Sequence, residues 1–293
     1  MEYHSELEIQ SHRGGLAAWF DPRRFGRDLR DAAQFVWQVR KLAFAMASRE
    51  LRTRYSGQFA GAFWIIGHPL FQMIVFVFVF GVVFKQRVGG SVEMPRDYTT
   101  YILSGLVPWL ALSGSLPSLC SSITNNANLV KQFTFQTELF AIKDVLISMV
   151  FWGVGMVIAT GYGIVTTASL PWTYLLLPIV LVLTLMFAIG LGWILSALGV
   201  FVRDMKDMAV VFVTAGIYVL PVVYLPSWVP KAFQPLIGLN PFSSFVWVYQ
   251  DTLYFGRFEH PYAWAFFIVM SLLCFGLGFR LFQALKPYFG KVI

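Results

Sequence analysis

Residues 64–84 read WIIGHPLFQMIVFVFVFGVVF and contain no aspartate, glutamate, lysine or arginine. A helix needs about 20 consecutive apolar residues to cross the hydrocarbon core of a bilayer. The stretch therefore predicts a membrane-spanning helix, and the composition of the whole chain agrees. Hydrophobic residues make up 57% of the 293 residues and charged residues 13%, which is about half the charged share of a typical globular domain. Such a composition excludes both a soluble globular protein and a disordered chain.

Other uncharged stretches predict five further crossings. Residues 98–130 give the second. Residues 145–202 are too long for one crossing and break at TTASLPWTY, where Pro171 favours a turn, so they count as two helices. Residues 208–230 and 261–279 complete the set. The expected fold is therefore an all-α integral membrane protein with six transmembrane helices.

Lysine and arginine are distributed unevenly between the predicted loops. Residues 1–54 hold ten of the 22, the loops at 131–143 and 203–206 hold two each, and the tail from Arg280 holds three. The alternate loops hold the remaining five. Because positively charged loops stay in the cytoplasm, both termini are predicted to be cytoplasmic. This topology also accounts for the formal net charge of +7, so nucleic-acid binding is not indicated. We expect residues 1–54 to form a cytoplasmic segment and residues 55–293 a six-span membrane domain.

The segment 231–257 is apolar but interrupted by Pro235, Pro241 and a Gly-Leu-Asn-Pro run. It begins and ends on the outer side, so a full crossing would reverse every later charge assignment. Irregular backbone is tolerated at membrane depth where protein or a water-filled cavity satisfies its polar groups. We predict an outer re-entrant helical hairpin between spans five and six. An interfacial loop lying flat on the outer surface fits the sequence equally well.

Residues 28–55 have the pattern of an amphipathic helix. Apolar residues recur at steps of three and four; they are Ala32, Phe35, Val36, Val39, Leu42, Ala43, Met46 and Ala47. The other face carries the cations Arg30, Arg40, Lys41, Arg49, Arg52 and Arg54. Such a helix lies along the membrane surface with its cations near anionic headgroups, and we assign that role to Arg49, Arg52, Arg54 and Tyr55. Docking of another protein or of an anionic substrate headgroup is the alternative.

Catalytic and nucleotide-binding motifs are absent from the sequence. It contains no G-x-x-x-x-G-K-[ST] loop, HExxH pair or GxSxG elbow, and Cys120 and Cys274 lie singly in apolar runs. The 15 acidic residues all lie in loops or termini, whereas an ion-coupled carrier usually needs acids within its spans. We therefore expect no enzyme activity, no metal site and no cofactor in this chain. Any transport would draw its energy from a partner.

Six segments stand out, in order: RELRTRY (49–55) followed by GQFAGAFWIIGHPL, LSGLVPWL (103–110), NANLVKQFTFQTEL (126–139), LGVFVRDMKDM (198–208), PVVYLPSWVPKAFQPLIGLNPFSSFVWVYQDTLYFG (221–256) and the tail LKPYFGKVI. Together they resemble permeases of ABC transporters that export polysaccharides, a group that includes the O-antigen (Wzm type), capsule (KpsM type) and teichoic acid (TagG type) permeases. The tail is most similar to the O-antigen type. The resemblance covers the chain from about residue 28 to its end. The family's loop often reads Phe-Pro-x-Glu; here Gln136 replaces the proline, while Glu138 keeps its place. Gln250 stands where the family commonly has arginine.

The resemblance implies a homodimer in the bacterial inner membrane, capped by two cytosolic ATPase subunits that bind ATP and magnesium. A helix from Asn125 to Glu138 would be the main coupling element, with the 203–207 loop as a second contact. The residues assigned to coupling are Asn125, Asn126, Asn128, Lys131, Gln132, Glu138, Arg203, Asp204, Lys206 and Asp207.

A channel for sugar chains needs aromatic faces that stack on sugar rings. Candidates by residue type are Trp109, Trp152, Tyr162, Tyr218, Tyr224 and Trp247, each of which also fits an ordinary membrane-interface aromatic. The leading hypothesis is the permease of an exporter of lipid-linked polysaccharide. The alternatives are an ABC exporter of small amphiphilic drugs and a membrane enzyme acting on lipid-linked sugars.

Overall fold

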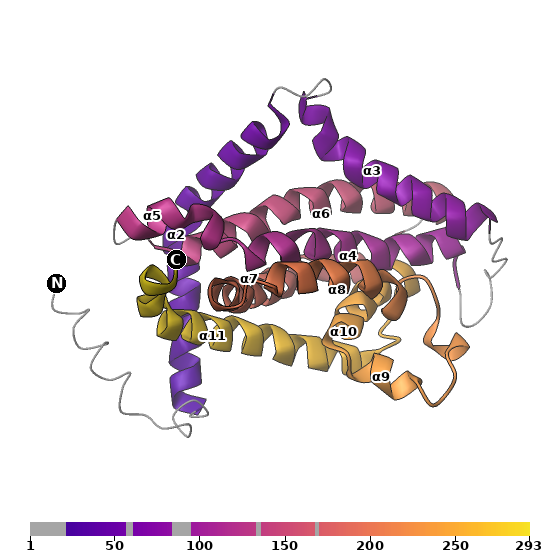
Figure 1. The fold of residues 1–293 in the computed structure, drawn as a ribbon. Helices are drawn as coiled ribbons and strands as arrows, with labels where there is room; N and C mark the ends of the chain where they lie inside the picture. Colours follow the sequence, from indigo (N-terminus) through magenta and orange to yellow (C-terminus); the bar gives the residue numbers. More distant parts are fainter. Residues whose placement is uncertain (1–21, 57–60, 84–94, 133–135, 168–169) are drawn as a thin grey trace.

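The computed structural model describes residues 22–56, 61–83, 95–132, 136–167 and 170–293. All regular elements within these residues are helical. Most of the long helices run side by side in one bundle, and α2 (Pro22–Tyr55) crosses one end of it (Figure 1). The all-α prediction is confirmed for the described part of the chain.

Within the described residues, four helices are long and apolar enough to cross a membrane. These are α4 (Tyr98–Cys120), α6 (Glu138–Thr167), α7 (Leu177–Phe201, preceded by the 3₁₀ turn Trp172–Leu176) and α11 (Pro261–Val292). The first predicted span is the shorter helix α3 (Trp64–Phe76), which continues as a π-helix over Val77–Val83; the fifth is α8 (Met205–Val219), with 15 residues. The number six for the crossings thus stays a prediction.

Helices α7 and α11 form the most extensive helix pair in the described structure. A Cβ atom added at Gly190 of α7 would overlap the backbone of Cys274, and one at Gly278 of α11 would overlap the backbone of Gly190. The two backbones therefore touch, as small residues allow in membrane helix pairs. Gly199 meets the backbone of Cys120 at the end of α4 in the same way. These contacts lock α4, α7 and α11 together.

The residues predicted to form an amphipathic helix lie within α2, one side of which is buried. Ala32, Val39, Ala43 and Ala47 are buried, and the helix packs on α6 and α11. Leu42 was assigned to this face but is 49% exposed. The buried residues recur at steps of four and seven, and residue 42 lies outside that narrow stripe of the helix surface. Nearness to the membrane interface stays a prediction for α2.

An ion pair fastens α2 to α11 near the start of α2. Arg280 Nε donates to Asp28 Oδ2 at 2.6 Å. Burial raises the pKa of the Asp28 carboxyl, and the bond to Arg280 opposes that rise.

The predicted hairpin segment folds as short helices. They are a 3₁₀ turn at Pro226–Trp228, α9 (Gln234–Leu239), α10 (Pro241–Gln250) and a π-helix at Asp251–Phe255. Asn240 caps α10 by accepting a hydrogen bond from Phe242 N at 3.0 Å. Residues 243–254 are all buried, and α10 packs between α4 and α11. The segment thus enters the bundle, and its depth in a bilayer stays a prediction.

The single helix expected from Asn125 to Glu138 is replaced by separate elements. A 3₁₀ turn (Thr124–Asn126) leads into α5 (Ala127–Gln132), and Glu138 is the first residue of α6. An acidic residue in the first turn suits the positive end of the helix dipole. Glu138 therefore belongs to a different helix from the other predicted coupling residues of this loop. α5 and the C-terminal end of α11 lie at the end of the bundle that α2 crosses, opposite α9 (Figure 1).

Candidate functional site

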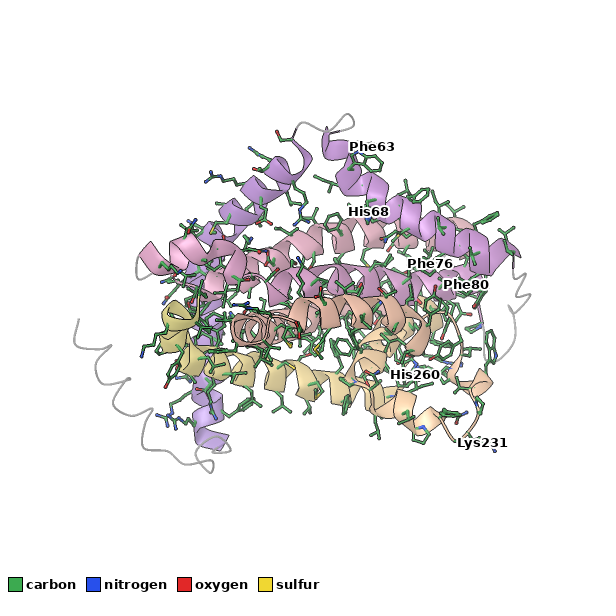
Figure 2. All side chains as sticks on the ribbon, viewed as in Figure 1. Phe63, His68, Phe76, Phe80, Lys231 and His260 are labelled. Carbon is green, nitrogen blue, oxygen red and sulfur yellow. The ribbon has the colours of Figure 1, made fainter. Side chains whose placement is uncertain are left out.

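A cavity of about 450 Å³ lies between α3, α4 and α6, next to the last turn of α2. Its polar lining includes Arg54, His68, Gln72 and Asp144. His68 lies on the side of α3 that faces the bundle, whereas Phe63 points away (Figure 2). The imidazole of His68 thus forms part of the cavity wall.

Serines of α4 and α6 supply further polar lining. Ser113, Ser115 and Ser118 line the cavity from α4, and Ser148 lines it from α6. The serine hydroxyls donate to carbonyls one turn back, as Ser115 does to Leu112 (2.7 Å) and Ser118 to Ser115 (2.8 Å). Their oxygen lone pairs remain able to accept. The cavity wall therefore combines hydroxyl, imidazole and amide groups with apolar side chains.

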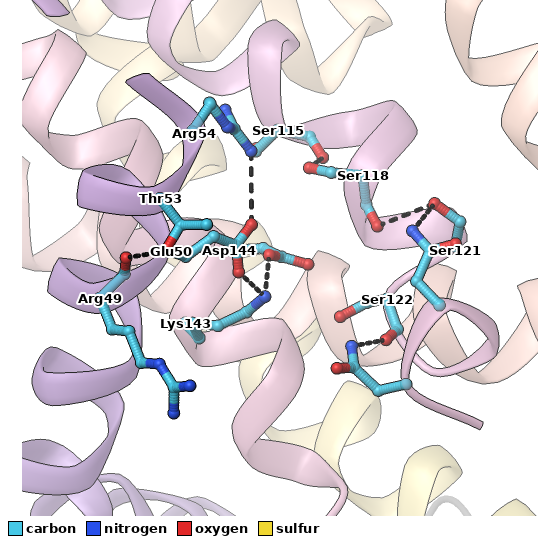
Figure 3. Close-up of polar contacts among 12 residues, drawn as sticks. Arg49, Glu50, Thr53, Arg54, Ser115, Ser118, Ser121, Ser122, Lys143 and Asp144 are labelled. Atoms are coloured by element: carbon cyan, nitrogen blue, oxygen red, sulfur yellow. Dashed lines mark hydrogen bonds and ion pairs between the residues drawn. The ribbon is translucent and has the colours of Figure 1, made fainter. Parts of the chain in front are cut away.

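Charged residues meet at the α2 end of this cavity. Lys143 Nζ bonds to Glu50 and lies 3.0 Å from Asp144 Oδ1, while Arg54 Nη2 lies 3.4 Å from Glu50 Oε1 (Figure 3). Lys143 and Asp144 are almost fully buried. Two carboxylates and two cations thus balance one another, and they join α2 to the beginning of α6.

Hydrogen bonds continue from α4 toward α5. Asn125 Nδ2 donates to Ser121 Oγ at 3.1 Å, and Asn126 Nδ2 donates to the Ser122 carbonyl at 2.8 Å. These bonds fix the turn between α4 and α5. Asn125 and Asn126 therefore make structural contacts in addition to any role on the surface.

Seven of the ten predicted coupling residues are exposed. They are Asn125, Asn128, Lys131, Arg203, Asp204, Lys206 and Asp207. The side chain of Gln132 lies outside the described residues. Glu138 differs, because its carboxylate is 1% exposed and accepts from Gln283 Nε2 (2.8 Å) and Lys286 Nζ (2.7 Å) of α11. Glu138 is therefore buried against α11, and its role in coupling stays a prediction.

The predicted headgroup residues lie near the end of α2. Arg49 and Arg52 are exposed, and Arg54 reaches the rim of the cavity. The side chain of Tyr55 lies outside the described residues. Contact of the three arginines with lipid headgroups stays a prediction.

The six predicted channel aromatics are dispersed, and none of them lines the cavity. Trp109 is buried edge-on against Phe212 and Phe242, at centroid distances of 5.9 and 6.1 Å. Trp247 stacks on His260 at 5.0 Å. Both are therefore packing residues within this chain.

The other four aromatics use or expose their polar groups. Trp152 Nε1 donates to the Tyr249 hydroxyl at 3.0 Å, and the Tyr162 hydroxyl donates to Asp97 at 3.1 Å. Tyr224 donates to the Val219 carbonyl, while Tyr218 is 63% exposed. A channel-lining role for these residues stays a prediction.

Sequence reasoning missed the polar residues of the cavity. The available signal for these residues was the run SGSLPS at 113–118, which places three serines in a predicted span. Serine is common in membrane helices, so the run by itself did not show that the serines face one cavity with Gln72 and His68. That fact depends on how α3 packs against α4.

Comparisons with known proteins agree on one family. A family model described as ABC-2 type transporter matches residues 41–254, from the middle of α2 to the π-helix Asp251–Phe255. An O-antigen export system permease protein RfbA from Klebsiella pneumoniae is 24% identical over 86% of this chain and 95% of that protein. A protein of the same name from Myxococcus xanthus is 24% identical over 88% of this chain and 97% of its own length. The family model covers well over half of the chain, and this chain belongs to the ABC-2 type transporter family.

Proposed function

We propose that this chain is the permease subunit of an ATP-driven ABC exporter that moves a lipid-linked polysaccharide, such as O-antigen, across the bacterial inner membrane. The observation that carries the proposal is its similarity, over 86–88% of its length, to proteins named as O-antigen export permeases. Within the ABC-2 family this similarity favours a polysaccharide over a small drug.

The proposed assembly is a homodimer with two cytosolic ATPase subunits, which would bind ATP and magnesium. The sequence has no nucleotide-binding loop of its own. The exposed residues Asn128 and Lys131 of α5 and the charged turn at 203–207 gather polar groups suited to docking a partner. ATP-driven movement of the ATPases would then be passed to the permease at this end of the bundle.

The proposed topology has six crossings with both termini in the cytosol. Four long apolar helices, α3 with its π-helical extension, and α8 supply the six segments. α5 and the end of α11 share one end of the bundle, opposite α9 (Figure 1), which agrees with the charge distribution. The hairpin of α9 and α10 would then lie on the outer side.

The cavity between α3, α4 and α6 is the proposed contact site for the glycan. Sugar rings present hydroxyl groups at their edges and apolar C–H faces, so they need both kinds of partner. The serines of α4, with Gln72 and His68, supply hydrogen-bonding groups; Trp64 and Phe151 supply apolar faces in the same lining. The charged network at Lys143 closes the α2 end of the site.

The direct test is purification of the chain from its native membrane in mild detergent, followed by mass spectrometry of bound proteins and lipids. We expect an ATPase with a nucleotide-binding loop together with a polyprenyl-linked sugar. Recovery of the ATPase with a small amphiphile and no glycan would move the assignment to a drug exporter. Recovery of neither would overturn the proposal.

A further inference from the structure

The strongest unexplained feature outside the cavity is the buried carboxylate of Glu138. Its Oε1 atom accepts from both Gln283 Nε2 (2.8 Å) and Lys286 Nζ (2.7 Å), and within the described residues Oε2 has no hydrogen-bond partner. A buried charge is costly unless it is paired. The side chain of Lys286 supplies the ion pair and is itself only 35% exposed. The position of Glu138 therefore depends on α11.

The backbone of Glu138 is held as well. Trp193 Nε1 of α7 donates to the Glu138 carbonyl at 3.1 Å, and the Trp193 side chain is fully buried. The Trp193 ring in turn packs on Phe275 and Phe279 of α11, with centroids 5.3 and 5.1 Å away. One residue at the beginning of α6 thus contacts two other helices.

Helix α11 is longer than a membrane crossing requires. Its 32 residues span about 48 Å at 1.5 Å per residue, whereas the hydrocarbon core is about 30 Å thick. Near its end it also contacts α5, because Lys131 Nζ donates to the Ile293 carbonyl at 2.8 Å. The helices on both sides of the α5–α6 connection, whose residues 133–135 are not described, are therefore held against α11.

We propose that Gln283 and Lys286 are positioning residues for energy coupling: they hold the beginning of α6 against α11, next to the end that contacts α5 through Lys131. Movement imposed on α5 by a partner would then be passed to α11 and, through its tight contact with α7, to the bundle. Coupling between distant sites needs such a chain of packed and bonded groups with a defined geometry. The inference rests on the proposed function, since it concerns how that exporter uses ATP.

The test compares Lys286→Met with the matched control Lys291→Met, an exposed lysine in the last turn of the same helix. Each variant is produced in the native host and purified with its ATPase in lipid nanodiscs. ATP hydrolysis is measured on the complex, and glycan export is measured on the cells. We expect Lys286→Met to hydrolyse ATP while export per ATP falls about fivefold or more, the lower end of typical coupling between sites. Lys291→Met and Lys286→Arg should export as the wild type does.

A purely structural role predicts a different result. Loss of folded complex would lower hydrolysis and export together and leave their ratio unchanged, which would overturn the inference. If Lys286→Met does not assemble, Gln283→Leu removes the second donor and keeps the ion pair, and it should lower the same ratio. An unchanged ratio in Gln283→Leu would then overturn the inference. A wild-type complex without ATP-dependent export would instead refute the proposed function, and the inference with it.

Discussion

At the scale of single residues, Lys143 is a buried cation that pairs with two carboxylates. It lies between Glu50 and Asp144 with 8% of its side chain exposed. Lys143→Met should leave these carboxylates without their shared cation and lower the free energy of unfolding by about 3 kcal/mol, the lower end of the range for buried pairs because 35% of the Glu50 side chain is exposed. Thermal unfolding in detergent measures the effect.

The matched control is Lys41→Met, which removes an exposed lysine of α2. Exposed charges contribute little to stability, so its melting temperature should stay near that of the wild type. Adding Asp144→Asn to Lys143→Met should recover part of the loss, since one buried charge disappears. Equal melting temperatures for Lys143→Met and the wild type would show that the network does not stabilise the junction of α2 and α6.

Ser118 tests the cavity at the same scale. Its side chain is half-buried and lines the cavity from α4. Ser118→Leu should fill part of the space and remove one hydroxyl, which costs about 1 kcal/mol for a lost hydrogen bond, or about fivefold in export, before any steric effect. Thr166→Leu in α6 is the control, because it also removes a hydroxyl but lies at an exposed position outside the cavity lining. Equal export by both variants, at equal amounts of folded permease, would remove the cavity from the glycan path.

At the scale of the helices, α7 and α11 form the most extensive pair of the described bundle. Gly190→Ala places a methyl group against the backbone of Cys274, so the helices must separate. Overpacking of this kind costs about 1–3 kcal/mol, and the melting temperature should fall. Gly153→Ala in α6 is the control, because a Cβ there meets no atom within 4 Å. Alanine favours helix over glycine by about 1 kcal/mol, so Gly153→Ala should be neutral or slightly stabilising. A melting temperature for Gly190→Ala as high as that of Gly153→Ala would refute the close contact.

For the whole molecule, topology is the property to measure. Asp204→Cys and Lys231→Cys place thiols at exposed positions near opposite ends of the bundle. The proposed orientation predicts that a membrane-impermeant maleimide labels Lys231→Cys in intact spheroplasts and labels Asp204→Cys only after lysis. The native Cys120 and Cys274 lie within helices α4 and α11 and provide the background level. Labelling in the reverse order would overturn the proposed orientation.

Much of the helical content followed from local pattern. The period of α2 and the uncharged stretches around α4, α6, α7 and α11 are properties of consecutive residues, and the structure places helices there. The continuous helix expected from Asn125 to Glu138 was wrong, because Glu138, which was expected to end that helix, is the first residue of α6. For the segment 231–257 the sequence left open a re-entrant hairpin and a loop lying flat on the outer surface. Both stay predictions, and the structure adds that residues 243–254 are buried. Burial against α4 and α11 is not encoded in local composition.

The sequence by itself determined that this protein is helical and belongs in a membrane, since hydrophobicity and its period act over neighbouring residues. It also determined, through six ordered motifs, the family to which the chain belongs. Only the tertiary structure decided that Glu138 meets Lys286, 148 positions away, and that serines of α4 share a cavity with His68 of α3. Such pairings depend on how helices pack, which is set by contacts such as Gly190 on Gly278 and by the cost of leaving a buried charge alone.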